Sequence, residues 1–209
     1  MEPSGLWTWI TQRLNLTEMN GLIQKLTDYT RQTCGHETRF YLGLSQLHRP
    51  EEELVHEMLH GSKHQPDDAI KRLALGYVVE ADIRRRLEGI GIAIPNSQTE
   101  IVAVYDDRVK GHIDGQTVEK RQIYEIKSTV QAKLDTIKLS NKLPNDHFQQ
   151  VQAYLWHGDF QSCLMIYVAR DTGQIWAKEL WRITAMGKDL EAKAKRVLTE
   201  VDKKLNFNK

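Results

Sequence analysis

The chain contains few of the residues and segments that define several large protein classes. Only two of its 209 residues are cysteines, Cys34 and Cys163, which does not support a disulfide framework and is typical of a reducing, intracellular compartment. No run of about 18 apolar residues is present, so we expect no membrane-spanning helix and no membrane partner. The first residues lack a basic segment followed by a long apolar core, so we expect no secretory signal and a cytoplasmic protein.

The chain also lacks an excess of charge of either sign. Its 29 Lys and Arg residues balance 28 Asp and Glu residues, which leaves a formal net charge of +1. A polycation is therefore excluded, and any contact with nucleic acid must come from a local basic lining. The length suffices for one sizeable core with a helical elaboration.

Apolar periodicity separates a helical N-terminal part from a mixed part. In residues 1–64, apolar side chains recur at helical spacing, and Pro50 opens a helix with an acidic first turn. Residues 67–89 predict a longer helix. Its predicted apolar stripe consists of Ile70, Leu73, Ala74, Tyr77, Val78 and Ala81. We therefore predict a helical N-terminal elaboration over residues 1–64 and an α/β core over residues 65–209.

The period changes after residue 98. Residues 101–105 predict a strand, with Asp106 and Asp107 as its turn. Further along, the pattern predicts a helix or ordered loop over 129–143, a helix from Pro144 to Gly158, strands over 163–168 and 174–181, and a closing amphipathic helix. This order of elements is typical of a mixed α/β domain.

Two short predicted strands, residues 111–115 and 123–128, carry the residues around which we interpret the chain. In an antiparallel hairpin, Asp114 lies opposite Glu125. Side chains alternate along a strand, so Glu125 and Lys127 project from the same face. Two carboxylates and one lysine on one side of a sheet suit a site that binds a divalent cation and hydrolyses a phosphodiester.

This order of an acid followed by Glu-x-Lys resembles the PD-(D/E)xK nuclease superfamily. Gln150 and Tyr154 form a Gln-x-x-x-Tyr element on the helix after the Glu-x-Lys strand, which is similar to the RecB-like branch of that superfamily. This branch includes CRISPR-associated iron–sulfur exonucleases and related viral and recombination nucleases. The resemblance implies a restriction-endonuclease-like fold, with a mixed β-sheet core flanked by helices.

Two upstream elements extend the resemblance, which covers about residues 33–181. Gly76-x-x-x-Glu80 occupies the place of the branch's Gly-x-x-x-His/Glu element, whose last residue contributes to metal binding. Cys34 with residues 39–43 is similar to the N-terminal cysteine segment of the iron–sulfur members. For Glu80, a salt bridge with Arg84 one helical turn away is an alternative to metal binding.

The resemblance also implies a metal site. Asp114 and Glu125 would be the central ligands of Mg²⁺ or Mn²⁺, aided by the main-chain carbonyl of Ile126, and Glu80 would be a further ligand. The iron–sulfur members close their cluster with three cysteines near the C-terminus, but no cysteine follows Cys163. We therefore predict no iron–sulfur cluster and a buried Cys34.

The remaining motif residues take catalytic and substrate-binding roles by the same resemblance. Lys127 would position the attacking water, Gln150 would contact phosphate or orient Lys127, and Tyr154 would pack on a sugar or base. Apart from the resemblance, Lys133 and Lys138 are expected to bind substrate because they lie near the motif in the sequence. The full set of candidates for the basic lining of a DNA channel is Lys110, Lys120, Arg121, Lys133, Lys138 and Lys142.

The sequence thus predicts a metal-dependent deoxyribonuclease, most consistent with an exonuclease acting on single-stranded DNA or DNA ends. One alternative is a zinc metalloprotease, because His56-Glu57-x-x-His60 places two imidazoles and a glutamate on one helix. A second alternative is a non-catalytic DNA-binding module on a decayed nuclease fold. The oligomeric state stays open, and a homo-oligomer is one alternative.

Overall fold

The computed structural model describes residues 16–34, 38–62, 66–95, 99–119 and 121–207. Contacts divide the chain into two units, residues 1–35 with 65–74 and residues 36–64 with 75–209. The larger unit thus includes residues 36–64, which the sequence pattern assigns to the N-terminal elaboration, while the division at residue 64 stays a prediction. Residues 1–15, which belong to the segment with helical spacing of apolar side chains, lie outside the described residues.

The smaller unit contains helix α1 (Leu16–Cys34) and the first part of helix α3 (Asp67–Gly89). Arg31 on α1 forms an ion pair with Asp67 at the start of α3, with an N–O distance of 2.6 Å. The helical spacing predicted over residues 22–29 is confirmed. Cys34 is half-exposed rather than buried, because it ends α1 outside both apolar clusters of the fold.

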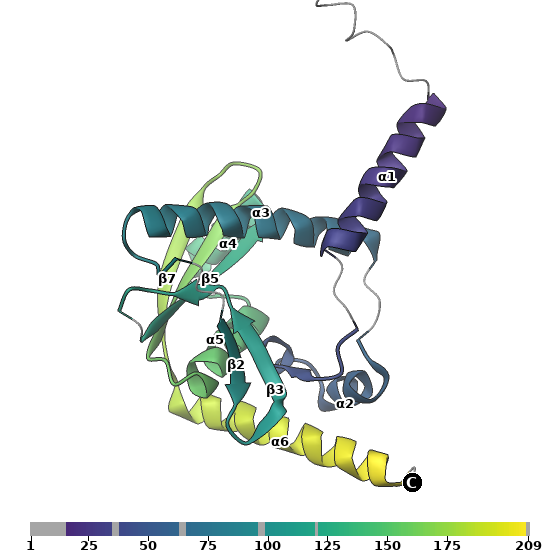
Figure 1. Ribbon diagram of the computed structural model, residues 1–209. Coiled ribbons are helices and arrows are strands. Elements are labelled where there is room, and N and C mark those ends of the chain that lie inside the picture. The colour runs from purple at the N-terminus through teal and green to yellow at the C-terminus, as the bar shows by residue number, and fades with distance from the viewer. Residues whose placement is uncertain (1–15, 35–37, 63–65, 96–98, 120, 208–209) are drawn as a thin grey trace, which may run out of the picture. The chain divides into compact units, whose positions relative to one another are not determined.

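The larger unit contains two β-sheets (Figure 1). A four-stranded mixed sheet has the order β4 (Gly115–Gln116), β5 (Gln122–Thr129), β6 (Ser162–Ala169) and β7 (Ile175–Trp181), in which β5 and β6 are parallel and the other pairs antiparallel. A three-stranded sheet has the order β1 (Leu42–Gly43), β3 (Asp106–Ile113) and β2 (Thr99–Ala103). The predicted mixed α/β core is confirmed.

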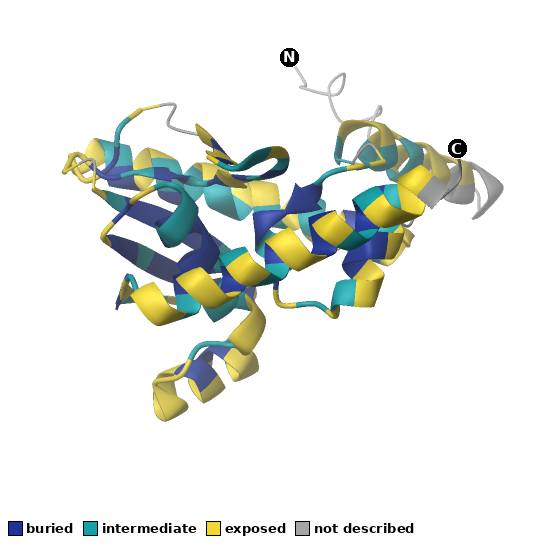
Figure 2. Ribbon diagram, turned by 90° about the horizontal axis from the view of Figure 1, so that it is seen from below, coloured by how far each residue is buried: buried dark blue, intermediate teal, exposed yellow. Residues whose placement is uncertain are grey.

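Strands β5 and β6 are covered on both faces, and Figure 2 shows them largely buried. On one face, Tyr124, Ile126 and Ile166 pack with Ile83 and Leu87 of α3. The other face joins the main core, which is shared with helices α4 (Gln131–Ser140), α5 (Asn145–His157) and α6 (Thr184–Phe207). Burial of apolar surface on both faces explains the continuous apolar run predicted over residues 163–168.

The helix starts follow their sequence signals. Helix α2 (Glu51–His60) begins after Pro50 and α5 begins after Pro144, and each proline carbonyl accepts the first intrahelical hydrogen bond. Acidic residues in the first turn complement the helix dipole. A short 3₁₀ turn, η1 (Leu44–Gln46), connects β1 to α2. Among the described residues no helix is long and apolar enough to cross a membrane.

Two local predictions were wrong. The turn between β2 and β3 lies at residues 104–105, and Asp106 is the first residue of β3, where its carboxylate accepts hydrogen bonds from Arg108. In the second half of α3, Ile83 and Leu87 are buried, whereas Val78 is 68% exposed. The face of α3 that covers the sheet is therefore set by where β5 and β6 lie, which the helical period alone does not reveal.

Candidate active site

Asp114 lies at the junction of the two sheets. Strand β3 ends at Ile113 and β4 begins at Gly115, so the single strand predicted over residues 111–115 is in fact divided. The predicted register is confirmed by the pairing of Gly115 with Tyr124, which puts Asp114 opposite Glu125. Asp114 Oδ2 accepts a hydrogen bond from the backbone N–H of Ile126 at 2.6 Å. The break in the strand thus orients the carboxylate toward β5.

Glu125 is the centre of the side-chain cluster, although only 1% of the residue is exposed. Its Oε1 accepts hydrogen bonds from Lys127 Nζ and from Gln150 Nε2, each at 2.7 Å. Its Oε2 is buried and has no hydrogen-bond partner in the part of the chain that the structure describes. A buried carboxylate oxygen without a partner is costly, and a bound cation is one way to satisfy it.

Helix α5 supplies the second side of the cluster. Gln150 and Tyr154 are one turn apart, and Gln150 Nε2 lies 3.2 Å from the Tyr154 hydroxyl. Only 3% of Tyr154 is exposed. Its burial and its contact with Gln150 favour a role in orienting Gln150 over the predicted packing on a sugar or base. Gly111 makes room for this ring, because a Cβ atom at Gly111 would lie 2.8 Å from Tyr154 Cε1.

Burial and neighbouring charges shift the pKa values of the cluster. Burial, and then the charge of Glu125, hold the pKa of Asp114 well above its usual range, and burial raises the pKa of Glu125. Burial alone would lower the pKa of Lys127, but the Glu125 and Asp114 carboxylates outweigh it and raise that pKa. Lys127 is therefore protonated, while the raised pKa values of the two carboxyl groups mean that their charged forms are unfavourable here without a cation, and a bound divalent cation would stabilise them.

Glu80 on α3 is a third carboxylate near this pair. Its charge contributes to the raised pKa values of Asp114 and Glu125, while its carboxylate forms the predicted ion pair with Arg84. Among the described residues, no three His, Cys, Asp or Glu side chains already form a metal site. The donor set that fits an oxygen-loving ion is thus the Asp114–Glu125 pair, with Glu80 close by and engaged elsewhere.

A cavity of about 400 Å³ opens beside Asp114 and Glu80. Its wall combines basic and aromatic side chains: the guanidinium of Arg39 and the ammonium of Lys110 lie 5.8 and 5.0 Å from the ring centroid of Tyr41. The remaining polar and aromatic lining residues are Ser45, Tyr77, His112 and Tyr154. A basic cleft next to buried carboxylates suits an anionic, flexible chain such as a nucleic-acid strand.

The structure places only some of the basic residues predicted to line a DNA channel at the cavity. Lys110 lines the cavity, as predicted. Lys133 and Lys138 lie on α4, outside this cavity, and Lys138 Nζ contacts Gln174 Oε1 at 3.2 Å. Lys120 lies outside the described residues. Arg39 and Tyr41 were missed as site residues, because only the parallel pairing of β1 with β3 brings their segment beside Lys110.

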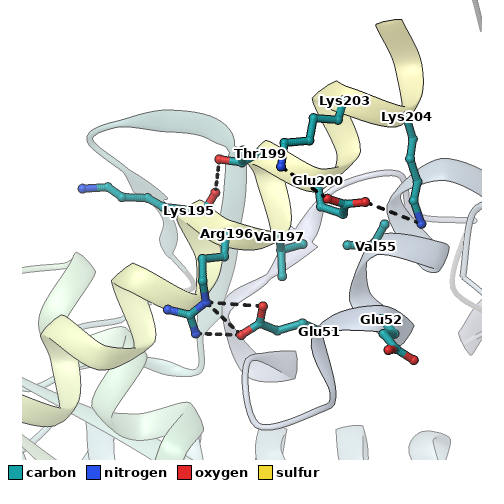
Figure 3. Close-up of a pocket in the computed structure, with 10 residues that line it drawn as sticks. All are labelled: Glu51, Glu52, Val55, Lys195, Arg196, Val197, Thr199, Glu200, Lys203 and Lys204. Atoms are coloured by element: carbon teal, nitrogen blue, oxygen red, sulfur yellow. Dashed lines mark hydrogen bonds and ion pairs between the residues drawn. The ribbon is translucent and has the colours of Figure 1, made fainter. Parts of the chain in front are cut away.

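A larger cavity, of about 750 Å³, lies between α2 and α6 (Figure 3). Its acids and bases pair with one another: Arg196 lies 2.6 Å from Glu51, and Lys203 lies 3.8 Å from Glu200. None of the residues of the Asp114–Glu125 cluster lines it. These charges of the larger cavity are already compensated. The smaller cavity, beside Asp114, is therefore the better candidate for an active site.

The His-Glu-x-x-His motif on α2 does not form a protease site. His56 and His60 are exposed and their ring centroids lie 4.6 Å apart. Glu57, however, forms an ion pair with Arg49 at 2.8 Å and accepts a hydrogen bond from Gln46. Its carboxylate is therefore engaged as a structural partner, whereas a zinc protease needs it as a general base.

Solved structures of other proteins share this fold. Among solved structures, the alkaline exonuclease LHK-Exo of Laribacter hongkongensis superposes with a TM-score of 0.66 at 17% identity, covering 80% of this chain and 91% of that protein. Its complex with dAMP gives a TM-score of 0.67 at 16% identity with the same coverage. At such low identity, these likenesses show the fold. No curated protein matches the sequence significantly.

The family model named YqaJ-like viral recombinase domain matches residues 44–161, which is more than half of the chain. The matched segment includes Glu80, Asp114, Glu125, Lys127 and Gln150. Membership of this family supports a nuclease that acts on DNA. The chain therefore belongs to the YqaJ-like viral recombinase family, within the PD-(D/E)xK nuclease superfamily.

Proposed function

We propose that this protein is a metal-dependent exonuclease that hydrolyses DNA phosphodiesters at single-stranded regions or ends. The observation that carries the proposal is the buried cluster of Asp114, Glu125, Lys127 and Gln150, in which Glu125 Oε2 has no hydrogen-bond partner among the described residues. The fold of an alkaline exonuclease and the family of the chain support the same reaction class.

The ion that fits these ligands is Mg²⁺ or Mn²⁺. Asp114 and Glu125 would hold it, with the main-chain carbonyl of Ile126, and Glu80 would join when it leaves Arg84. Both ions prefer carboxylate, carbonyl and water oxygens, which is what this cluster offers. When bound, the ion polarises the phosphate and lowers the pKa of an attacking water.

Lys127 acts as a fixed positive charge. Its ammonium is held by Glu125 Oε1 at 2.7 Å, and its raised pKa keeps it protonated. It therefore orients the water and stabilises charge that develops on the phosphate. Gln150 holds Glu125 in place and is itself held by Tyr154.

The cavity beside Asp114 would hold the DNA strand. Arg39 and Lys110 would neutralise phosphates, and Tyr41 offers an aromatic face for an unpaired base. Lys133 and Lys138, on α4, would contact more distant phosphates.

A single experiment tests the reaction class. End-labelled linear DNA, single- and double-stranded, and a covalently closed circle are incubated with Mg²⁺, Mn²⁺, Ca²⁺ or Zn²⁺. We expect Mg²⁺ or Mn²⁺ to support release of nucleotides from the linear substrates and to leave the closed circle intact. Cutting of the circle would identify an endonuclease instead.

The other two alternatives have distinct outcomes in the same assay. Binding of DNA without cleavage under every ion would identify a non-catalytic module. Cleavage of casein with Zn²⁺, lost in His56→Ala, would identify a protease.

A further inference from the structure

His147, on the first turns of α5, lies beside the proposed site without belonging to it. Its Nδ1 is 2.7 Å from the hydroxyl of Tyr167, and the two ring centroids are 5.7 Å apart. Tyr167 on β6 is the registered partner of Lys127 on β5. Neighbouring residues in a parallel pair point to the same side of the sheet, so His147 continues the row that begins with Glu125 and Lys127.

The hydrogen bond with Tyr167 sets the tautomer of the imidazole. Tyr167 is fully buried, and burial raises its pKa, so its hydroxyl keeps the proton. Among the described residues this hydroxyl has His147 Nδ1 as its one hydrogen-bond partner. A buried hydroxyl needs an acceptor for its proton. We therefore assign Nδ1 as the acceptor, which leaves the proton of the neutral ring on Nε2.

The charges that act on this imidazole are mainly positive. Burial, and then the charge of Lys127, lower the pKa of His147 to about 4, so the ring is neutral at pH 7. Lys133 and His48 act on it in the same direction. The carboxylate of Asp146 lies 3.9 Å from Nε2, which is beyond hydrogen-bond distance. The Nε2 proton is thus a donor without a hydrogen-bond acceptor in the described part of the chain, and Lys127 and Lys133 favour an anion there while Asp146 opposes it.

We propose that His147 Nε2–H binds a phosphate oxygen of the DNA strand that neighbours the scissile phosphodiester on the Lys127 side. This inference rests on the proposed nuclease function and adds a binding subsite to it. To fill this subsite, a DNA strand must extend beyond the scissile phosphodiester on the Lys127 side. Tyr167 is a positioning residue, since it acts on DNA only through the orientation of the imidazole.

Binding measured without divalent ions tests the subsite independently of catalysis. Fluorescence anisotropy in EDTA compares wild type with His147→Phe, which removes the donor, His147→Gln, which keeps a side-chain N–H, and Tyr167→Phe. His157→Phe is the matched control, because His157 is also half-buried on α5 but lies at its other end. Melting curves check that each variant is folded.

A hydrogen bond to a charged phosphate predicts that His147→Phe weakens binding by about 10–100-fold. We expect His147→Gln to recover most of this affinity, Tyr167→Phe to lose less, and His157→Phe to bind as wild type does. A series of oligonucleotides, each with one phosphate replaced by a neutral methylphosphonate, locates the contact. At one position the replacement should lower the affinity of wild type by the same factor and leave the affinity of His147→Phe unchanged.

The outcomes separate this inference from the function on which it rests. If wild type degrades DNA but folded His147→Phe and His147→Gln both bind every oligonucleotide as wild type does, the subsite is refuted and the nuclease stands. Equal losses in His147→Phe and His157→Phe would also refute it, by showing a structural effect. Failure of wild type to bind or cut DNA would refute the proposed function itself.

Discussion

The chain carries two motifs whose residue types suit a metal ion, one at Asp114, Glu125 and Lys127 and one at His56, Glu57 and His60. The first is buried where two sheets meet, and its carboxylates accept hydrogen bonds from groups on β5 and α5. In the second, the two histidines are exposed on a single helix and the glutamate is held by Arg49. The residues of the first motif thus depend on one another, whereas those of the second do not.

This difference shows what a short motif needs before it can act. Spacing along one helix suffices to bring two imidazoles together, but it does not bring further ligands or exclude water. The Asp114–Glu125 cluster receives Gln150 from another helix and the charge of Glu80 from a third element. Convergence of several elements, and the shifted pKa values that follow from it, distinguish the motif that we propose as the active site from the motif on α2.

The largest expected effect comes from substitution within the buried motif. Asp114→Asn and Lys127→Met should each reduce cleavage of end-labelled DNA with Mg²⁺ or Mn²⁺ by at least about 10²-fold, because each removes a ligand or a charge on which the reaction depends. Melting temperatures should show that both proteins are folded.

The same assay applied to the exposed motif completes the comparison. The double variant His56→Ala with His60→Ala should cleave at the wild-type rate, since neither side chain contacts the cluster. Loss of cleavage in this variant, with full activity in Asp114→Asn, would reverse our assignment of the two motifs.

His147, which lies beside the buried motif, should link the stability of the fold to pH. The pKa of His147 is lowered from 6.5 to about 4 in the folded protein. Below pH 6.5 the unfolded chain therefore binds a proton that the folded chain does not, and stability falls until the pH reaches the folded pKa. The full shift corresponds to about 3 kcal/mol of unfolding free energy.

Urea unfolding at intervals between pH 7 and pH 4 measures this linkage. The unfolding free energy of His147→Gln should decline less steeply than that of wild type over that range. Parallel curves for wild type and His147→Gln would show that His147 titrates alike in the folded and unfolded chains.

Local rules were enough to predict the pairs within each element of the site. Strand alternation placed Glu125 beside Lys127, and the helical turn placed Gln150 beside Tyr154. The hairpin register that sets Asp114 opposite Glu125 could also be predicted, because the two residues are close together in the sequence. These contacts are short in sequence, so the spacing of residue types carries the information.

Contacts between elements that are far apart in the chain could not be predicted from the sequence. Arg39 and Tyr41 reach the cleft only because β1 pairs with β3, about 65 residues later in the chain. The division of the predicted strand at Asp114 depends on the presence of two sheets. The buried face of α3 depends on where β5 and β6 lie. Each is a property of the assembled core, for which a single sequence has no local signal.

A glycine in the buried site should be sensitive to the smallest added side chain. In Gly111→Ala the new Cβ would lie 2.8 Å from Tyr154 Cε1 and 3.1 Å from Leu44 Cβ. Tyr154 must then move, and Gln150 with it, so we expect a loss of about 1–3 kcal/mol in unfolding free energy and a lower cleavage rate. Urea unfolding and initial rates of DNA degradation measure the two effects. Wild-type values for both would show that the ring can shift without cost.

Gly76, the glycine of the upstream Gly-x-x-x-Glu80 element, should behave in the opposite way. It lies inside α3, and the nearest heavy atom to an added Cβ is Ser128 Oγ at 4.0 Å. Alanine is favoured over glycine in a helix, so Gly76→Ala should raise the unfolding free energy by up to about 1 kcal/mol. Cleavage should stay at the wild-type rate, because no side chain has to move. A more stable Gly76→Ala protein that degrades DNA slowly would mean that the space beside Gly76 is occupied by the substrate, since the folded protein itself leaves it open.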